Sequence, residues 1–318
     1  MDALFLFPPI MTDRSDPNII GVGAIFIDDI VLPDGTTYMN RLGGGVVHAM
    51  MGAAIWEEHP GLVALAGNDL ALENIEYLRQ YMDLRGLFTL EIPQIRAWQI
   101  FEFDGTRREL YRVKVTTKFI AGATPNHYPN DYANSNGVYL LQDFNGIRTW
   151  SQHLTGKIIL WEPNANSMLP ENRRHMHDVL YKSDIDIVSP NLEEARQLYG
   201  NLAPEKIMDA LFDDHANIVV LRMGADGSLI GRRNSGIKHE IGVVKELNIL
   251  DQTGAGNTYC GAFLTGILRD KSLMEAGVMG AVAVSFCMES VGVLSPVSVD
   301  QTLRDTRYMQ LLKQTQMQ

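Results

Sequence analysis

A chain of 318 residues, of which 46% are hydrophobic, can bury the core of one large α/β domain. Its net charge of -11 argues against a nucleic-acid-binding surface, which requires clustered lysine and arginine. The longest uncharged apolar run, residues 276–288, is shorter than the roughly 20 residues that a membrane-spanning helix needs. We therefore expect a cytoplasmic protein that contacts neither nucleic acid nor a membrane.

Alternating strands and helices follow an irregular N-terminal arm, residues 1–17. Six short, almost continuously apolar runs are typical of strands that are covered on both faces. Helical spacing of apolar residues occurs between some of these runs, as in residues 72–84 and 192–199. The alternation predicts one α/β domain, residues 18–318, with a mostly parallel sheet and helices on both sides. The predicted strands are residues 18–23, 62–66, 137–141, 157–161, 185–189 and 217–223.

Two segments, residues 30–40 and 96–113, break this alternation. Each contains an Asp-Gly pair between strand-like flanks, which is the strongest short-range hairpin signal; the pairs are Asp34-Gly35 and Asp104-Gly105. We expect the two hairpins to form one small sheet that projects from the main body as a lid over a ligand site. An exposed edge of that sheet would favour pairing between two copies of the chain, so we also expect a homodimer through the lid.

The glycine turn Thr253-Gly254-Ala255-Gly256 is the most informative part of the sequence. It follows a strand predicted to end at Leu250 and precedes a helix predicted to open near Asn257, where apolar residues recur every four positions. Successive amides in such a turn, together with a helix N-terminus, favour binding of an anion such as a phosphate. The alternative is an ordinary strand-to-helix turn in which Asn257 caps the helix.

The turn is similar to the C-terminal signature of the ribokinase-like (PfkB) carbohydrate kinase family, Asp-Thr-x-Gly-Ala-Gly-Asp. Asp251, the glycine turn and the following helix, residues 258–263, carry this resemblance, which extends over about residues 18–297. It implies a three-layer ribokinase-like sandwich with a mostly parallel central sheet and a small β-hairpin lid. It also implies ATP and Mg²⁺ as cofactors, a hydroxyl of a sugar or nucleoside as the acceptor, and an anion hole for the γ-phosphoryl group formed by Gly254, Ala255 and Gly256.

Asn257 stands where the family has the aspartate that acts as general base. A neutral carboxamide does not take a proton from a hydroxyl, and loss of a general base typically costs about 10²–10⁴-fold in rate. The sequence therefore leaves two interpretations. The protein is an Mg-ATP-dependent kinase that uses another base, for which Asp28, His48 and Glu194 are candidates, or it is a catalytically impaired nucleotide- or sugar-binding protein, a pseudokinase. Asn257 and the Trp-Glu-Pro-Asn string at residues 161–164 resemble the divergent fungal maintenance-of-killer subgroup.

Two N-terminal segments resemble the acceptor-binding pattern of the family. Residues 23–28 are similar to its first strand, whose aspartate binds sugar hydroxyls, and residues 42–49 to its Gly-Gly-x-x-x-Asn-x-Ala signature. His48 replaces the asparagine, and an imidazole can still hydrogen-bond a hydroxyl, although a histidine on a helix entering the core can equally be structural. The resemblance assigns Asp28, Gly43, Gly44 and His48 to the substrate site.

Two later segments resemble the nucleotide side of the family's site. Residues 189–194 are similar to its Asn-x-x-Glu motif, whose glutamate positions water around Mg²⁺, but Asn191 and Glu194 also fit an ordinary capping box. Residues 220–227 are similar to its Thr-x-Gly-x-x-Gly segment with Arg222 in place of threonine, and Arg222 can pair with a phosphate or point into solvent. The resemblance assigns Asn191, Arg222, Gly224, Gly227 and Thr253 to the nucleotide, and Glu194 to Mg²⁺ through water.

Overall fold

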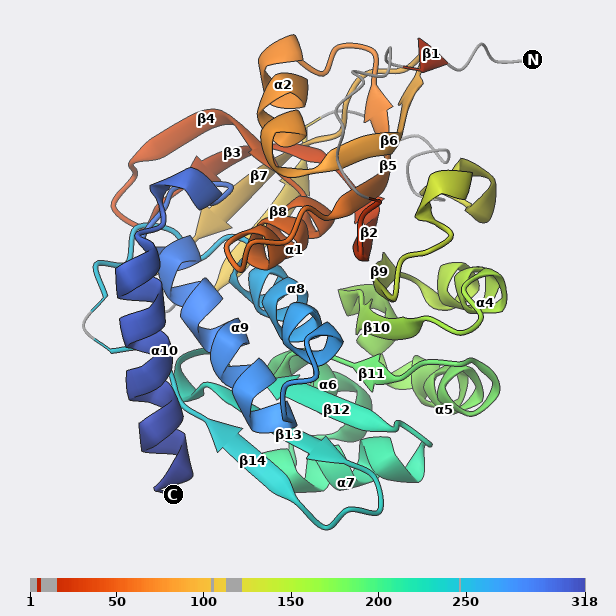
Figure 1. Cartoon of the computed structure of the whole chain (residues 1–318), viewed down its shortest axis with the longest axis vertical. Coiled ribbons are helices and arrows are strands. Elements are labelled where there is room, and N and C mark those ends of the chain that lie inside the picture. The colour runs from red at the N-terminus through yellow and green to blue at the C-terminus, as the bar shows by residue number, and fades with distance from the viewer. Residues whose placement is uncertain (1–4, 7–15, 104–105, 113–121, 246, 318) are drawn as a thin grey trace.

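The structure is a computed structural model that describes residues 5–6, 16–103, 106–112, 122–245 and 247–317. A ten-stranded sheet forms its middle layer (Figure 1). The neighbours from β6 to β12 pair in parallel, and antiparallel pairs occur only toward the edges, at β1–β6, β12–β13 and β13–β14. In spatial order the strands are β1 (Phe5–Leu6), β6 (Asp83–Leu90), β5 (Gly61–Gly67), β2 (Ile19–Ala24), β9 (Gly137–Gln142), β10 (Ile158–Pro163), β11 (Ile187–Val188), β12 (Ile218–Arg222), β13 (Ser228–Arg232) and β14 (Lys238–Ile241).

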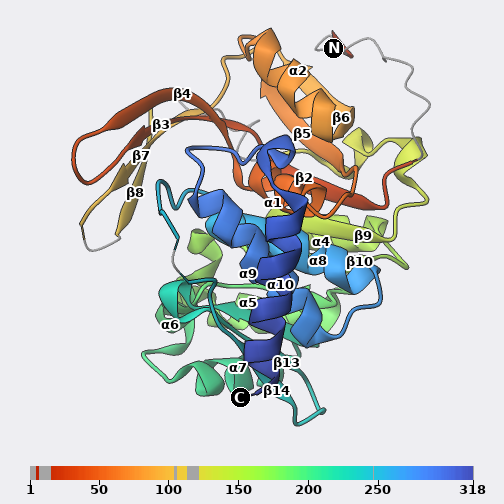
Figure 2. The ribbon, with the colours of Figure 1, turned by 60° about the vertical axis from the view of Figure 1, so that its left-hand side comes forward.

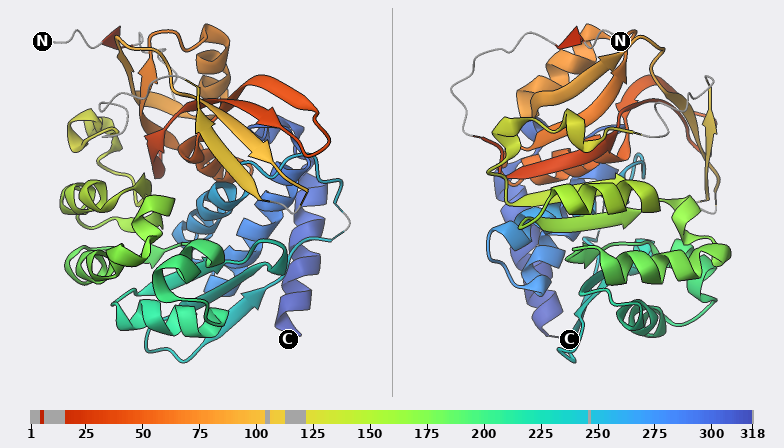
Figure 3. Two further views of the ribbon diagram at one scale, coloured as in Figure 1. Left: turned by 180° about the vertical axis from the view of Figure 1, so that it is seen from behind. Right: turned by 90° about the vertical axis from the view of Figure 1, so that its right-hand side faces the viewer.

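Helices cover both faces of this sheet, as the right-hand view of Figure 3 shows for the green and blue parts of the chain. Successive strand residues point to opposite faces and so enter two separate cores. In β9, for example, Tyr139 belongs to one core and Leu140 to the other. One face carries α1 (Gly45–Ala54), α2 (Leu72–Tyr81), α8 (Ala255–Leu268), α9 (Leu273–Met288) and α10 (Gln301–Gln316); the other carries α4 (Phe144–His153), α5 (Arg173–Lys182), α6 (Leu192–Tyr199) and α7 (Pro204–Asp213). The predicted three-layer α/β fold is confirmed.

A second, four-stranded sheet projects from the body (Figure 2). Its order is β4 (Thr37–Gly43), β3 (Phe26–Val31), β7 (Arg96–Phe101) and β8 (Arg107–Tyr111). Each predicted hairpin is an antiparallel pair, and a parallel β3–β7 pairing joins the two. The turn at Asp34-Gly35 lies between β3 and β4, whereas Asp104-Gly105 lies outside the described residues. We call these four strands the small sheet.

Some boundaries differ from the sequence-based predictions. The helix predicted over residues 72–84 ends at Tyr81, because Met82 is extended (φ -138°, ψ 150°) and the unpredicted strand β6 begins at Asp83. The predicted strand ending at Leu250 is wrong, since residues 247–250 form no strand. Most of the N-terminal arm lies outside the described residues, and its β1 pairs with β6 at the sheet edge.

The strand order reverses between β2 and β9. From β2 the sheet continues outward through β5 and β6, and from β9 it continues the other way through β10, β11 and β12. In open α/β sheets, ligands bind outside the carboxyl ends of the strands at such a switch point. No helix in the described part of the chain is long and apolar enough to cross a bilayer.

Candidate active site

The glycine turn begins α8, and its geometry requires glycine at two positions. Gly254 is the N-cap residue, with a left-handed φ of 74° that glycine adopts at low cost. A Cβ at Gly254 would overlap the His48 ring, and one at Gly256 would overlap Nη1 of Arg222. The backbone of the turn therefore approaches both side chains closely, and the first amides of a 14-residue helix point outward beside them.

Asp251 holds this turn in place. Its Oδ1 accepts hydrogen bonds from the Thr253 amide (2.8 Å) and hydroxyl (2.7 Å), and its Oδ2 accepts from the Gly292 amide (2.8 Å). Thr253 was predicted to bind nucleotide, but its side chain is buried and its hydroxyl donates a hydrogen bond to Asp251. Its side chain supports the turn.

Asn257 lies in the first turn of α8 and does not cap the helix as one interpretation expected, because Gly254 occupies the cap. Its Nδ2 donates to the Tyr139 hydroxyl (3.2 Å) and to Oε2 of Glu162 (3.1 Å). The Tyr139 hydroxyl in turn donates to the same Oε2 (2.7 Å), and burial raises the pKa of Tyr139 well above its usual value. The carboxamide acts here as a donor to a buried carboxylate, a role that an ionised aspartate cannot fill.

Arg222 lies directly beneath Gly256. Its Nη2 is 2.8 Å from Oε1 of Glu162 and donates to the Ser189 carbonyl at 2.9 Å. Burial disfavours the guanidinium charge, but the Glu162 carboxylate outweighs this, and the net effect raises the pKa of Arg222. The sequence left Arg222 either pairing with a phosphate or pointing into solvent. The structure places it inside, against the glycine turn, with Nε lacking a partner among the described residues.

Glu194, predicted to organise Mg²⁺, lies near Arg222 at the start of α6. Asn191 caps this helix, its Oδ1 accepting from the Glu194 amide at 2.8 Å, and its backbone bridges to that of Arg222. Burial raises the pKa of Glu194, while the Arg222 charge lowers it.

A cavity of about 510 Å³ opens on the other side of Arg222 and Gly256. One end is polar and backbone-rich, with Gly224 and Gly227 after β12, while apolar side chains from three segments line the remainder. A cavity with an apolar wall beside a helix N-terminus is suited to a ligand that has a flat apolar ring and an anionic group. The apolar lining comprises Val243, Val244, Leu247, Ile249, Ala281, Val284 and Met288. We call it the nucleotide cavity.

The predicted substrate residues gather between the small sheet and the turn. Asp28 is buried beside Gly43, where a Cβ would overlap its carboxyl group, and burial raises its pKa to about 7. Gln99 Nε2 donates to Asp28 Oδ1 (3.0 Å) and to Glu109 Oε1 (2.8 Å). Gly44 caps α1 with a φ of 103°. Buried carboxyl and amide groups facing one another are suited to hydroxyl recognition.

His48 is buried against Gly254, and burial lowers the pKa of its imidazole to about 4. Neither ring nitrogen has a hydrogen-bond partner among the described residues. A neutral imidazole with both nitrogens unpartnered is costly in a packed interior unless a ligand supplies a partner.

Three residues that complete this arrangement were not predicted from the sequence as site residues: Tyr139, Gln99 and Glu162, the last of which pairs with Asn257 and Arg222. Glu162 carried a signal, since it lies in the Trp-Glu-Pro-Asn string. Gln99 shared a face with Ala97 and Phe101 in an alternating strand, and nothing in the sequence marked Tyr139.

Comparison with known proteins gives consistent results. Residues 162–300 match the model of the pfkB family carbohydrate kinases. An uncharacterized protein of Schizosaccharomyces pombe is 26% identical over 321 residues (87% of this chain, 86% of the relative). A cytidine kinase of Thermococcus kodakarensis is 25% identical over 272 residues (83% and 93%), and protein MAK32 of Saccharomyces cerevisiae is 26% identical over 184 residues (52% and 51%).

Solved structures share the fold. A putative ribokinase II of E. coli in complex with ATP and Mg²⁺ superposes with a TM-score of 0.72 at 16% identity, covering 92% of this chain and 99% of that one. The nucleoside kinase of Methanocaldococcus jannaschii gives 0.70 at 18% identity, covering 93% and 100%. The likeness to MAK32 is consistent with the maintenance-of-killer-like subgroup. The chain therefore has the ribokinase-like fold, and its residues 162–300 match the pfkB family carbohydrate kinases.

Proposed function

We propose that the protein binds Mg-ATP and transfers its γ-phosphoryl group to a hydroxyl of a sugar or nucleoside. The nucleotide cavity is the observation that supports this most strongly. It combines an apolar slot with the glycine turn, the α8 N-terminus and the buried guanidinium of Arg222. The adenine would pack between α9 and the side chains of Val243, Val244, Leu247 and Ile249, and the phosphates would meet the amides of the turn.

The residues present fit a nucleotide-bound Mg²⁺. The described residues contain no cluster of three or more metal-ligating side chains, and Mg²⁺ carried by ATP needs few, because it retains several waters. Glu194, whose pKa burial raises and the nearby Arg222 charge lowers, is the carboxylate that would receive those waters. When bound, the ion would neutralise charge on the phosphate oxygens.

The acceptor would lie between the small sheet and the turn, with Asp28, Gln99 and His48 as its hydrogen-bonding partners. The unpartnered nitrogens of His48 and the unpartnered Oε1 of Gln99 favour a polar ligand there. Among the described residues nothing donates to Asn257 Oδ1, so this oxygen is free to accept the hydrogen bond of an attacking hydroxyl. It would orient the hydroxyl without removing its proton, which a loose phosphoryl-transfer transition state tolerates best.

A second candidate is a nucleotide- or sugar-binding protein without turnover. The environment of Asn257 favours it, since the amide is held by Glu162 and Tyr139 in a network that requires a donor. In this alternative the protein binds the same ligands and releases no ADP.

The test is ADP release with Mg-ATP over a panel of sugars and nucleosides, for the wild type and Asn257→Asp in parallel. Acceptor-dependent ADP from the wild type supports the kinase. Turnover by Asn257→Asp alone supports the binding protein. If neither protein forms ADP with any acceptor, phosphoryl transfer to this class of substrates is contradicted.

A further inference from the structure

Glu162 is a buried carboxylate that lies among hydrogen-bond donors near the carboxyl end of β10, where it is only 6% exposed. Its Oε1 is 2.8 Å from Arg222 Nη2. Its Oε2 accepts hydrogen bonds from the Tyr139 hydroxyl (2.7 Å) and from Asn257 Nδ2 (3.1 Å). Both oxygens therefore act as acceptors, which an ionised carboxylate allows. A glutamine of the same size would present one acceptor and one donor.

The donors that Glu162 binds belong to different parts of the site. Arg222 lines the nucleotide cavity, and a Cβ at Gly256 would overlap its Nη1. Asn257 carries the oxygen that would meet the acceptor hydroxyl. Glu162 itself lines neither of the two cavities described here. It therefore acts on a ligand only through Arg222 and Asn257.

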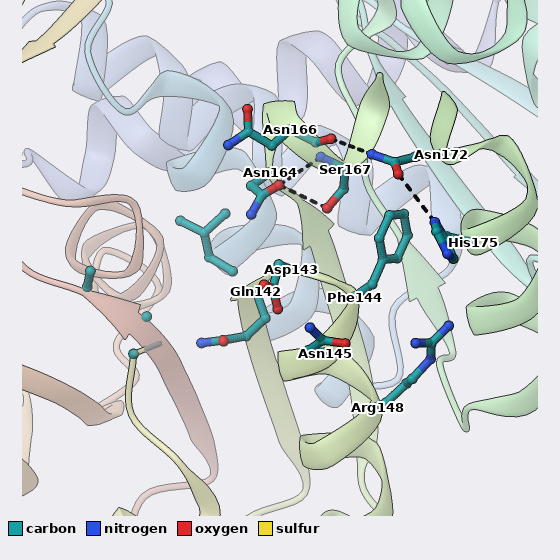
Figure 4. Close-up of a pocket in the computed structure, with 14 residues that line it drawn as sticks. Gln142, Asp143, Phe144, Asn145, Arg148, Asn164, Asn166, Ser167, Asn172 and His175 are labelled. Carbon is teal, nitrogen blue, oxygen red and sulfur yellow. Dashed lines mark hydrogen bonds between the residues drawn. The ribbon is translucent and has the colours of Figure 1, made fainter. Parts of the chain in front are cut away.

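The second of these cavities, of about 520 Å³, lies outside the carboxyl ends of β2, β9 and β10 (Figure 4). Leu141 lines it and packs with Asn257 against Gly45, where a Cβ would lie 2.5 Å from Leu141 Cδ2 and 2.9 Å from Asn257 Nδ2. Figure 4 shows Asn164, which follows Glu162 and Pro163, at the wall of the same cavity. The Asn257 side chain thus lies between the buried carboxylate and a space that a small molecule can enter.

The Asn257 amide has two possible orientations, which differ by the exchange of Oδ1 and Nδ2. With Oδ1 toward Glu162, two acceptors would face one another. The Tyr139 hydroxyl, whose own proton goes to Glu162, would also lose the donor that it accepts from. With Nδ2 toward Glu162, every group is satisfied, and Oδ1 is left for the site. The Glu162 carboxylate therefore determines which end of the amide a ligand meets.

We propose that Glu162 is the positioning residue of the site. One of its oxygens turns the Asn257 carbonyl toward the acceptor hydroxyl, and the other holds the Arg222 guanidinium beneath the glycine turn. The consequence for turnover rests on the proposed function, whereas the orientation of the amide does not. The chain thus carries the central carboxylate of its site on β10, in place of one at position 257 of α8.

Glu162→Gln separates the two roles of the carboxylate. The glutamine oxygen can serve only one side, and Arg222 takes it because charge-assisted hydrogen bonds are the stronger ones. The glutamine amide then donates toward Asn257, which turns over so that its Oδ1 accepts and its Nδ2 points into the site. We expect acceptor-dependent kcat/KM to fall roughly tenfold or more, because the acceptor hydroxyl loses its hydrogen-bond acceptor. The affinity for Mg-ATP, which depends on Arg222, should change little.

Adding Asn257→Asp to Glu162→Gln restores the pair with its polarity reversed. The introduced aspartate has two equivalent oxygens, so one accepts from the glutamine amide and the other faces the site in either orientation. One negative charge also remains near Arg222. We expect the double variant to unfold at a higher temperature than either single variant, a non-additivity typical of residues in direct contact. It should also recover the acceptor-dependent turnover that Glu162→Gln loses.

The amide gives a direct readout that needs no turnover. Heteronuclear NMR of the isotope-labelled full chain identifies the side-chain amide protons of Asn257 by their absence from the spectrum of Asn257→Asp. We expect these protons to exchange slowly with solvent in the wild type, because they bind Glu162 and Tyr139, and rapidly in Glu162→Gln. Glu205→Gln is the matched control, since Glu205 is exposed in the first turn of α7 and should leave the exchange unchanged.

Rapid exchange of the Asn257 amide in the wild type, slow exchange that persists in Glu162→Gln, or a double variant no more stable than the single variants would each overturn the proposal. If circular dichroism shows that Glu162→Gln is unfolded, the wild-type amide and the double variant still decide. The absence of ADP from every protein contradicts the proposed function alone. Turnover of Glu162→Gln at the wild-type rate contradicts this inference alone.

Discussion

Asn257 donates to two oxygen acceptors that are themselves buried, and this determines what an acid would do in its place. An aspartate there would put a second carboxylate about 3 Å from Glu162, as judged by the 3.1 Å separation of Asn257 Nδ2 and Glu162 Oε2. Two adjacent carboxylates cannot both ionise readily, so the pKa of one of them rises. Arg222 offsets part of the repulsion, since it pairs with Glu162 on the other oxygen.

Asn257→Asp should therefore lower the free energy of unfolding at pH 8 by roughly 1–3 kcal/mol. The carboxyl group with the raised folded-state pKa is protonated at lower pH, so the loss should shrink as the pH falls from 8 to 5. Urea unfolding at the two pH values measures this. Asn257→Ala removes the donor without adding charge, and its loss should be the same at both values. An Asn257→Asp protein as stable as the wild type at pH 8 would contradict the network.

Asp28 gives a pH dependence of known sign. Burial raises its folded-state pKa from the usual 3.8 to about 7, so the unfolded chain gives up this proton first. The contribution of Asp28 to stability therefore falls as the pH rises from about 4 to about 7 and stays low above that.

Asp28→Asn keeps an oxygen for the Gln99 amide but does not ionise. We expect this variant to gain stability relative to the wild type, by roughly 1–3 kcal/mol, between pH 5 and pH 8. Thermal or chemical unfolding of both proteins at these pH values measures the difference in stability. A difference in stability between the two proteins that does not change with pH would contradict this prediction, because it would mean that folding does not raise the pKa of Asp28.

The sequence identified the residues with a short-range signature and missed those that depend on distant contacts. Gly254 and Gly256 are recognisable because the amides of a tight turn need glycine locally. The bond between Asn257 and Glu162 joins residues 95 positions apart, and neither residue type reveals it. The orientation of Arg222 could not be predicted for the same reason, since the buried glutamate that holds it lies on another strand.

At the scale of the elements, the N-terminus of α8 determines where the Asn257 side chain lies. The helix begins at Ala255, two residues before the predicted start, because left-handed Gly254 takes the cap position and leaves Asn257 inside the first turn. This places the Asn257 side chain beside β9 and β10.

Gly256→Ala should disturb the nucleotide site more than the fold. The added Cβ would overlap Arg222 Nη1, so the guanidinium would have to move from its position beneath the turn. We expect the affinity for Mg-ATP to fall by roughly tenfold or more, because both the cradle and its buried charge are displaced. Calorimetric titration of the variant, after circular dichroism has shown a native spectrum, provides the measurement. Unchanged affinity would mean that the phosphates bind elsewhere.

The predicted elements were reliable where strands are buried on both faces. The runs in β5, β9 and β12 are almost wholly apolar because helices cover both sides. Strand β6 was not predicted, because its sequence, DLRGLFTL, mixes charged residues and a glycine with apolar residues. The segment before the glycine turn was wrongly predicted to be a strand for the opposite reason. Its Ile249 and Leu250 are apolar but exposed and unpaired with any strand, and Ile249 lines the nucleotide cavity.

At the scale of the whole molecule, the small sheet leaves two edges, β4 and β8, whose residues are largely exposed. Exposed strand edges favour pairing between copies. We predict a homodimer joined through this sheet, measured by gel filtration with light scattering. A mass near that of the 35.5 kDa chain at high protein concentration would contradict it.

The proposed function depends on one cavity, in which a nucleotide would bind against the glycine turn. Its most direct test is calorimetric titration of the full chain with Mg-ATP, for the wild type, Ala281→Trp and Ala71→Trp. Ala281 is buried in the wall of the nucleotide cavity, whereas Ala71 is exposed at the start of α2 and serves as the control. We predict one ATP per chain for the wild type and Ala71→Trp, and a loss of binding in Ala281→Trp, whose indole fills the slot. No binding to the wild type, or undiminished binding to Ala281→Trp, would contradict the account.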